Sequence, residues 1–288
     1  MTTTGRLIGL LQTPRGKIRQ VAISTVSGVM RALLTFLTAL GLIAGVSAIP
    51  AAAAPPSTSY YGLGDSIAAG TGAVMPTPAA PCLQNTKFAY PNQLGATKNL
   101  GCYGATTSDV QNQANSLPTN VRNVTITVGA NDVGAGNVAV TCVTATLQTQ
   151  CQQAIAYSTL VILPQLPAKL AATISVIHAK APAAHITLTG YPLLFTVPGL
   201  PAADQPVATE INAATTALNQ TIALTALTHA ARYADVTLPF YNHGIGSPDP
   251  WINPLTPIST TTWDPGSFHP NAPGYTLGYV PAVARFLN

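Results

Sequence analysis

The stretch SYYGLGDSIAAGTG at residues 59–72 decides the fold that this sequence predicts. Its aromatic beginning indicates a short strand over residues 59–63. The strand runs directly into Gly64-Asp65-Ser66, after which small residues begin a helix. Ser66 is therefore expected at the end of a strand and in the first turn of a helix, where its N–H points out of the helix terminus and stabilises negative charge.

Outside this stretch, strands and helices alternate along the chain. We expect a long irregular loop over 239–268 and a loop or hairpin over 135–150. The alternation favours an α/β fold with a mostly parallel sheet, whose ligand crevice lies at the carboxyl ends of the strands. Further strands are expected at 99–102, 121–128, 185–189 and 231–238, and helices at 108–117, 152–181 (bent at Pro164 and Pro167), 206–230 and 272–287.

The N-terminal segment reads as a secretory signal peptide. Residues 1–31 carry five basic residues and no acidic one, the apolar run ALLTFLTALGLIAGVSA follows at 32–48, and small residues come next. This pattern predicts a signal peptide over residues 1–54, cleaved after Ala48 or after Ala54, and a single domain over 55–288. An uncleaved membrane anchor is the alternative, but the apolar run is short for a span of about 20 residues.

The charge of the chain gives no sign of nucleic-acid binding, and we expect no nucleic-acid partner. The whole chain has a formal net charge of +4, but five of its twelve basic residues lie in the predicted signal peptide. The remainder keeps seven basic and all eight acidic residues, which gives a net charge of about −1. No basic stripe with interleaved aromatic residues is present.

The four cysteines of the chain lie behind the predicted signal peptide and form no C-x-x-C pair, which disfavours a zinc site. An even number in an exported chain indicates disulfides. Three pairings are possible, with free buried thiols as the alternative. We favour Cys82–Cys102 and Cys142–Cys151, because each closes a loop between two expected elements.

A serine hydroxyl needs a base and preorganised donors for the oxyanion before it can act as a nucleophile. Gly104 follows the second expected strand, and a glycine there lets the backbone approach a substrate closely. Asn131 follows the strand at 121–128 and can donate through its side-chain amide. Each of these two residues, taken alone, is also typical of a plain turn.

His269 is the candidate base. It is followed by Pro270, which stiffens the backbone, and it precedes the last expected helix. Of the other four histidines, three fall in or beside regular elements. His243 lies in the long loop and stays a minor alternative as a substrate contact.

The candidate residues stand in the order GDS, Gly104, GAND and His269. In this order, and in the surrounding sequences YYGLGDSIAAGTG, LGCYGATTSDV, TVGANDVG and SFHPNAPGY, the chain resembles the SGNH/GDSL hydrolase family, in particular its secreted bacterial esterase/lipase branch. The resemblance spans nearly the whole mature chain and implies a three-layer, flavodoxin-like α/β/α sandwich. It also implies Ser66 as nucleophile, His269 as base, and an oxyanion hole made by the N–H groups of Ser66 and Gly104 and the amide of Asn131.

Two departures from the family pattern matter. The family usually has an aspartate three residues before the histidine, where this chain has Gly266, and the nearest acid is Asp264. Either Asp264 reaches the imidazole across the intervening turn, or the Gly266 carbonyl holds it; we favour the carbonyl, and either would fix the tautomer. The branch also often has a third disulfide across the long loop, where this chain has no cysteine but has Trp251 and Trp263, which either pin the loop or line the acyl pocket.

We therefore expect a secreted or cell-envelope esterase or lipase that hydrolyses small-molecule or lipid esters through an acyl-enzyme on Ser66. We expect a monomer that needs neither a metal nor an organic cofactor. The alternatives are a polysaccharide O-acetyl esterase that uses the same residues, and a non-catalytic secreted surface-binding protein on the same scaffold.

Overall fold

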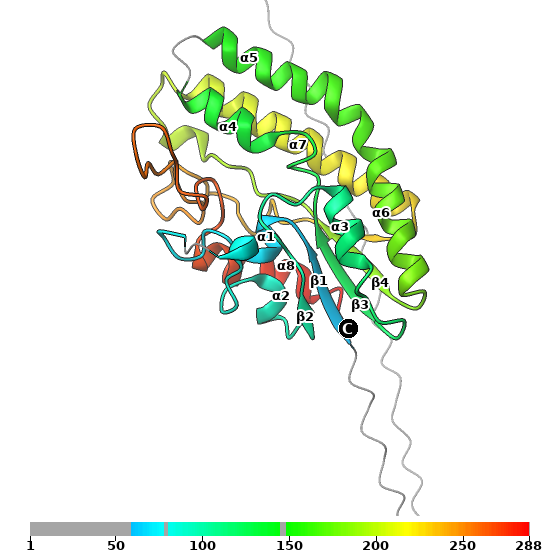
Figure 1. Cartoon of the computed structure of the whole chain (residues 1–288). Coiled ribbons are helices and arrows are strands. Elements are labelled where there is room, and N and C mark those ends of the chain that lie inside the picture. The colour runs from blue at the N-terminus through cyan, green and yellow to red at the C-terminus, as the bar shows by residue number, and fades with distance from the viewer. Residues whose placement is uncertain (1–58, 78–79, 145–147, 288) are drawn as a thin grey trace, which may run out of the picture. The chain divides into compact units, whose positions relative to one another are not determined.

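The computed structural model describes residues 59–77, 80–144 and 148–287 (Figure 1), all of which belong to one compact unit. The predicted signal peptide over residues 1–54, with both of its cleavage sites, lies outside the described residues.

A five-stranded sheet forms the centre of the fold. Its order is β2-β1-β3-β4-β5, and every neighbouring pair is parallel. The predicted parallel α/β architecture is confirmed, although the strands are shorter than expected at the two edges of the sheet. The strands are β1 (Tyr60–Gly64), β2 (Lys98–Asn99), β3 (Asn123–Thr127), β4 (His185–Thr189) and β5 (Arg232–Ala234).

Helices cover both faces of the sheet (Figure 1). On one face α3 packs against α6, and α6 packs against α7; on the other, α2 packs with α8 and the π-helical turn before it. The helices are α1 (Ser66–Ala69), α2 (Tyr90–Gln93), α3 (Thr107–Ala114), α4 (Ala135–Thr144), α5 (Gln148–Ala156), α6 (Leu166–Lys180), α7 (Gln205–Thr228) and α8 (Val280–Ala284). Shorter turns lie at Pro81–Leu83, Tyr157–Ile162, Leu163–Gln165, Val197–Gly199 and Gly274–Tyr279.

The expected loop or hairpin over 135–150 is wrong, because this segment contains α4 and the beginning of α5. The β-branched residues of α4 favour strands. The segment is nevertheless helical, since Val138 and Cys142 lie one helical turn apart and bury one face against Ile211 of α7. The predicted bend at Pro164 and Pro167 is present as a π-helical turn and a 3₁₀ turn between α5 and α6.

Both predicted disulfides, Cys82–Cys102 and Cys142–Cys151, are present. The long loop after β5 has no disulfide and is held by aromatic packing instead. Trp251 is buried, stacks on His243 with ring centroids 3.6 Å apart, and meets Phe240 edge-on. Trp251 therefore pins the loop, whereas Trp263 lines the cleft described below.

Candidate active site

Ser66 begins α1 directly after β1, at the carboxyl edge of the sheet. Gly64 has a φ of +131°, and a Cβ at this position would collide with the backbone of Thr127 on β3. Only glycine lets the two strands come this close before the chain turns. Asp65 then caps α1 by accepting a hydrogen bond of 2.9 Å from the N–H of Ile67.

His269 meets Ser66 although 203 positions separate them in the chain. Nε2 of the imidazole lies 2.6 Å from the Ser66 hydroxyl oxygen, which is a direct hydrogen bond. The other ring nitrogen, Nδ1, lies 2.9 Å from the carbonyl oxygen of Ser267. In the tautomer with the proton on Nδ1, the Nδ1–H group donates a hydrogen bond to this carbonyl. Nε2 then has a free lone pair and can act as the base.

The carbonyl of Ser267 takes this position because of the local backbone. Phe268 has a φ of +61°, in the left-handed region, so the backbone turns sharply between Ser267 and His269. The turn brings the Ser267 carbonyl next to the imidazole of His269. The turn is clamped by Asn253, whose N–H donates to the His269 carbonyl at 2.9 Å and whose carbonyl accepts from the Phe268 N–H at 2.9 Å.

Neither orienting group expected from the sequence contacts the imidazole. The Gly266 carbonyl accepts hydrogen bonds from the backbone N–H of His269 and from the side chain of Asn253, both at 3.1 Å. The Asp264 carboxylate accepts from the N–H and the hydroxyl of Thr77 at 2.9 and 2.7 Å, and from the Gly266 N–H at 2.7 Å. Asp264 therefore holds the turn that carries His269. The backbone carbonyl that contacts the imidazole is that of Ser267, one residue after Gly266.

The electrostatic environment keeps the imidazole neutral. Burial lowers the pKa of His269 to about 4, although the Ser267 carbonyl and the nearby Asp264 act to raise it. Burial acts to raise the pKa of Asp264, but its hydrogen bonds from Thr77 and Gly266 outweigh this effect and leave the pKa below its usual value. At neutral pH the site therefore pairs a neutral imidazole with a hydroxyl, the state from which a base can accept a proton.

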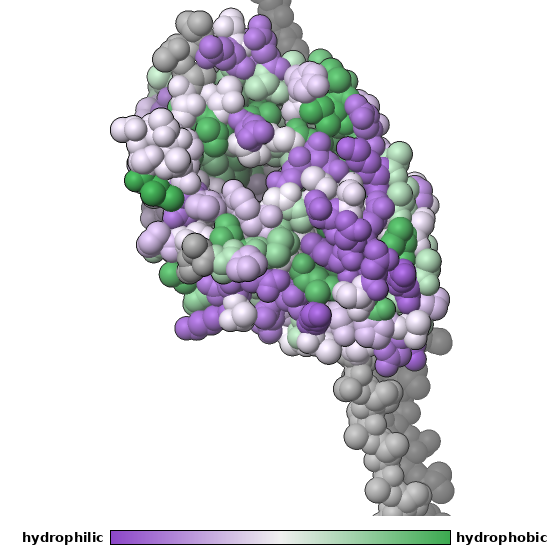
Figure 2. All heavy atoms as spheres, in the orientation of Figure 1, coloured by the Kyte–Doolittle hydropathy of each residue, from purple (hydrophilic) through white to green (hydrophobic). Residues whose placement is uncertain are grey.

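The residues expected to supply the three oxyanion donors line the same cleft as His269. Ser66, Gly104, Asn131 and His269 all line one cleft of about 580 Å³. Gly104 has a φ of +78° and open space where a Cβ would stand, and the Asn131 amide donates one hydrogen to the Ala105 carbonyl at 2.9 Å, which leaves the other hydrogen free. Figure 2 shows a hollow beside α4, with apolar side chains in its wall.

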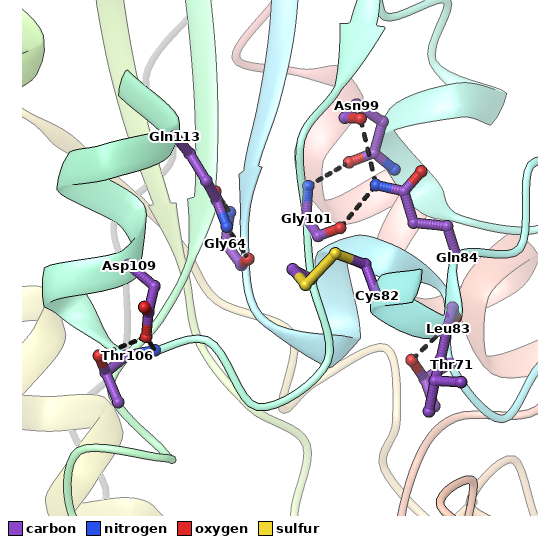
Figure 3. Close-up of a disulfide and its surroundings, with 11 residues drawn as sticks. Gly64, Thr71, Cys82, Leu83, Gln84, Asn99, Gly101, Thr106, Asp109 and Gln113 are labelled. Atoms are coloured by element: carbon purple, nitrogen blue, oxygen red, sulfur yellow. Dashed lines mark hydrogen bonds between the residues drawn. A yellow bond between two sulfur atoms is a disulfide. The ribbon is translucent and has the colours of Figure 1, made fainter. Parts of the chain in front are cut away.

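The segment that carries Gly104 is tied to its neighbours (Figure 3). The Cys82–Cys102 disulfide joins it to the loop before α2, and the Gln84 side chain donates to the Gly101 carbonyl at 2.6 Å. On the other side, the Gln113 side chain of α3 bonds both backbone groups of Gly64, at 2.8 and 2.9 Å. These contacts fix both the nucleophile turn and the Gly104 turn.

Sequence reasoning missed a buried link between the turn that carries Ser66 and the segment of Ala130 and Asn131. The Tyr191 hydroxyl donates to the Asp65 carboxylate at 2.6 Å and accepts from the N–H of Ala130 at 3.1 Å. Burial raises the pKa of Asp65 to about 7, although the hydrogen bonds from Tyr191 and Ile67 act to lower it. Tyr191 follows β4 and so lies at the same sheet edge as Ser66, which is the signal that could have found it.

Within residues 59–77, 80–144 and 148–287, no three His, Cys, Asp or Glu side chains lie close enough together to hold a metal ion. The chemistry that the described residues support is proton transfer between a hydroxyl and an imidazole beside N–H donors, which is the arrangement of acyl transfer.

Comparison with known proteins agrees with this arrangement. The model of the GDSL-like lipase/acylhydrolase family matches residues 63–277. The chain is similar to "Lipase 1" of Streptomyces coelicolor, with 32% identity over 268 residues, which cover 87% of this chain and 97% of that protein.

Two solved structures share the fold at 30% sequence identity, each with a TM-score of 0.71. One is the extracellular lipase from Streptomyces rimosus, where the match covers 80% of this chain and 100% of the other. The second is phospholipase A1 from Streptomyces albidoflavus NA297, where the match covers 80% of this chain and 99% of the other.

Proposed function

Because this chain belongs to the GDSL-like lipase/acylhydrolase family and is a carboxylic ester hydrolase, we propose that it cleaves esters through an acyl-enzyme on Ser66 with His269 as general base. The observation that carries this proposal is the 2.6 Å hydrogen bond between the Ser66 hydroxyl and Nε2 of His269. A neutral imidazole in direct contact with the hydroxyl can accept its proton during attack, without a rearrangement of the site.

Acylation begins when Nε2 of His269 takes the hydroxyl proton and Ser66 Oγ bonds to the ester carbonyl carbon. The carbonyl oxygen becomes an oxyanion, which the Ser66 N–H, the Gly104 N–H and the free hydrogen of the Asn131 amide stabilise. Among the described residues the two N–H groups make no other hydrogen bond, so they are available for this charge. The tetrahedral intermediate then collapses, and the alcohol leaves with the proton held on Nε2.

Deacylation repeats these steps with water. Nε2 takes a proton from a water molecule, whose oxygen bonds to the acyl carbon and rebuilds the oxyanion in the same set of donors. Ser66 Oγ then leaves with the proton from the imidazolium, and the carboxylic acid is released. Throughout the cycle the Ser267 carbonyl holds Nδ1–H and so keeps Nε2 aimed at the reacting oxygen.

The substrate class that we propose is a lipid ester or another ester with an apolar acyl group. The wall of the cleft beyond the reacting groups carries aliphatic side chains, among them Val140, Leu194 and Leu218. Relatives named as a lipase and as a phospholipase A1 support the same class. A polysaccharide O-acetyl esterase would use the same catalytic residues, so a chain-length series of aryl esters measured beside acetylated glycans separates the two.

We also propose that the protein acts outside the cell after loss of an N-terminal signal peptide. The basic and apolar pattern of residues 1–54 supports this proposal, as does the name of the extracellular lipase from Streptomyces rimosus. Mass spectrometry of the protein recovered from culture medium tests it, with Ile49 or Pro55 as the expected first residue.

The catalytic assignment is tested by Ser66→Ala and His269→Ala, each of which should lower kcat/KM for an aryl ester by on the order of 10⁴ or more. A fluorophosphonate probe should label the unaltered protein but not Ser66→Ala. The matched controls are Ser175→Ala on an exposed part of α6 and His185→Ala at the exposed start of β4, and both should keep full activity. Full activity in Ser66→Ala would eliminate the proposed mechanism.

A further inference from the structure

A second, smaller cavity of about 60 Å³ lies next to the catalytic cleft. We call it the α4–α7 cavity, because its walls come from α4, from α7 and from the π-helical turn between α5 and α6. The residues that line it but not the cleft are Val133, Val138, Ser158, Thr159, Leu163, Ile211 and Ala214. Most protein interiors are close-packed, so an unfilled space of this kind beside an active site is unusual.

The α4–α7 cavity is apolar in chemistry, although three hydroxyl-bearing residues line it. The hydroxyl of Ser158 donates to the Val133 carbonyl at 2.7 Å. Those of Thr159 and Thr215 donate to backbone carbonyls one turn earlier in their helices, at 2.8 and 3.1 Å. No lining residue is ionisable. Because the hydroxyl hydrogens are already used, the cavity offers little to a water molecule and favours hydrocarbon.

Four residues line both the cavity and the cleft, so the two spaces adjoin each other: Ala135, Leu194, Thr215 and Leu218. Ser66, Gly104 and Asn131 line only the cleft. A group as short as acetyl, held at Ser66 in the oxyanion hole, would not extend to the cavity. Only the distal part of a longer hydrocarbon chain could do so.

The walls of the cavity are braced. The Cys142–Cys151 disulfide joins α4 to α5, and both cysteines are buried with Val138 and Ile211 in a separate apolar cluster. Because the lining is firmly held, a side chain enlarged at this site should exclude a ligand instead of simply displacing the wall.

We propose that the α4–α7 cavity binds the terminal methylenes of medium- and long-chain acyl groups, and so sets the acyl preference of the enzyme. This inference rests on the proposed acyl-enzyme at Ser66. Each methylene buried in an apolar site contributes roughly a fourfold factor to kcat/KM. Loss of the cavity should therefore reduce activity on long acyl chains and leave acetyl esters unaffected.

Ala214 offers the sharpest test, because it lines the cavity and not the cleft. Ala214→Val and Ala214→Leu fill the cavity in two steps. Ala213→Leu makes the same addition on the exposed neighbouring position of α7 and is the matched control. The readout is kcat/KM for aryl esters from acetate to palmitate with one constant leaving group, followed by acetates of alcohols of increasing length.

We expect the decanoate-to-acetate ratio of kcat/KM to fall in the order unaltered protein, Ala214→Val, Ala214→Leu. The fall should reach roughly tenfold or more in the leucine variant, the effect of about two methylenes, and Ala213→Leu should keep the original ratio. An unchanged ratio in folded, acetate-active Ala214 variants would overturn the inference, as would a loss that follows only the length of the alcohol. Ser66→Ala, measured beside them, tests the acyl-enzyme separately, because its activity must disappear on every ester whatever the cavity does.

Discussion

The carbonyl oxygen of Ser267 lies 2.9 Å from Nδ1 of His269, in the position that the aspartate of a Ser-His-Asp triad would occupy. A carbonyl fixes the tautomer and orientation of the imidazole as a carboxylate does. It carries a dipole and no full charge, so it stabilises the imidazolium of the transition state less than a carboxylate at the same distance would. In the proposed mechanism, the oxyanion donors therefore supply a larger share of the transition-state stabilisation.

Asp264→Asn should lower kcat by less than tenfold. The carboxylate holds Thr77 and the N–H of Gly266 and does not contact the imidazole, so its loss should appear in the free energy of unfolding, by roughly 1–3 kcal/mol. Asp235→Asn is the control, because Asp235 makes similar bonds to Thr237 at an exposed site. Denaturant unfolding and kcat measured together check this; a loss in kcat on the order of 10⁴ would mean that Asp264 acts on the imidazole after all.

The acid limb of the pH profile should lie near pH 4. Only the neutral imidazole can accept the Ser66 proton, and burial lowers the pKa of His269 to about 4, so kcat/KM should fall only as the pH drops through that value. The measurement is kcat/KM for an aryl ester from pH 3 to 8, with circular dichroism to verify that the protein stays folded. A limb near pH 6.5, the ordinary value of histidine, would contradict the prediction.

Tyr191→Phe should lower kcat by between roughly 10- and 100-fold while the KM of a short ester stays nearly constant. The substitution removes the hydroxyl that joins Asp65 to the N–H of Ala130, and so should loosen Asn131, the proposed oxyanion donor, relative to Ser66. Tyr60→Phe is the matched control, since Tyr60 is buried at the start of β1, away from Ser66, and its hydroxyl shares a hydrogen bond with that of Thr125 on β3. Equal kcat values in the two variants would make Tyr191 a purely structural residue.

Asn131→Ala should lower kcat by about 10²- to 10³-fold, the usual effect of losing one oxyanion donor. Binding of the ground-state ester should change little, because the amide is needed most when the carbonyl oxygen becomes charged. Asn137→Ala removes an exposed asparagine from the same cleft and should leave kcat unchanged. Steady-state kinetics on one aryl ester check both variants, and an effect on KM alone would assign Asn131 to substrate binding.

Much of the fold and of the site could be predicted from the sequence, because the signals are local. The alternation at 121–128 and the small residues around Gly64 and Ser66 specify a strand and a tight turn wherever they occur. Parallel strands bring their carboxyl ends to one edge, so residues far apart in the chain could be assigned to one site before any contact was known.

What could not be predicted depends on contacts without a local pattern. A backbone carbonyl has no sequence signature. Whether the carbonyl of Gly266 or that of Ser267 contacts the imidazole depends on the left-handed conformation of Phe268. The segment that forms α4 was taken for a loop or hairpin, because the burial of Val138 and Cys142 against Ile211 of α7 is a long-range contact that the sequence does not display. Tyr191 bonds Asp65 across 126 positions, which no window of sequence can register.

The reacting pair also joins the two ends of the folded domain, since Ser66 stands in the first helix and His269 just before the last. Synthesis runs from the N-terminus, so a growing polypeptide carries its hydroxyl for almost the whole of translation without the imidazole that activates it. In the proposed mechanism, a chain that ends before His269, or one that is unfolded, has no esterase activity. The order of the two residues along the chain thus delays ester cleavage until the domain is complete and folded.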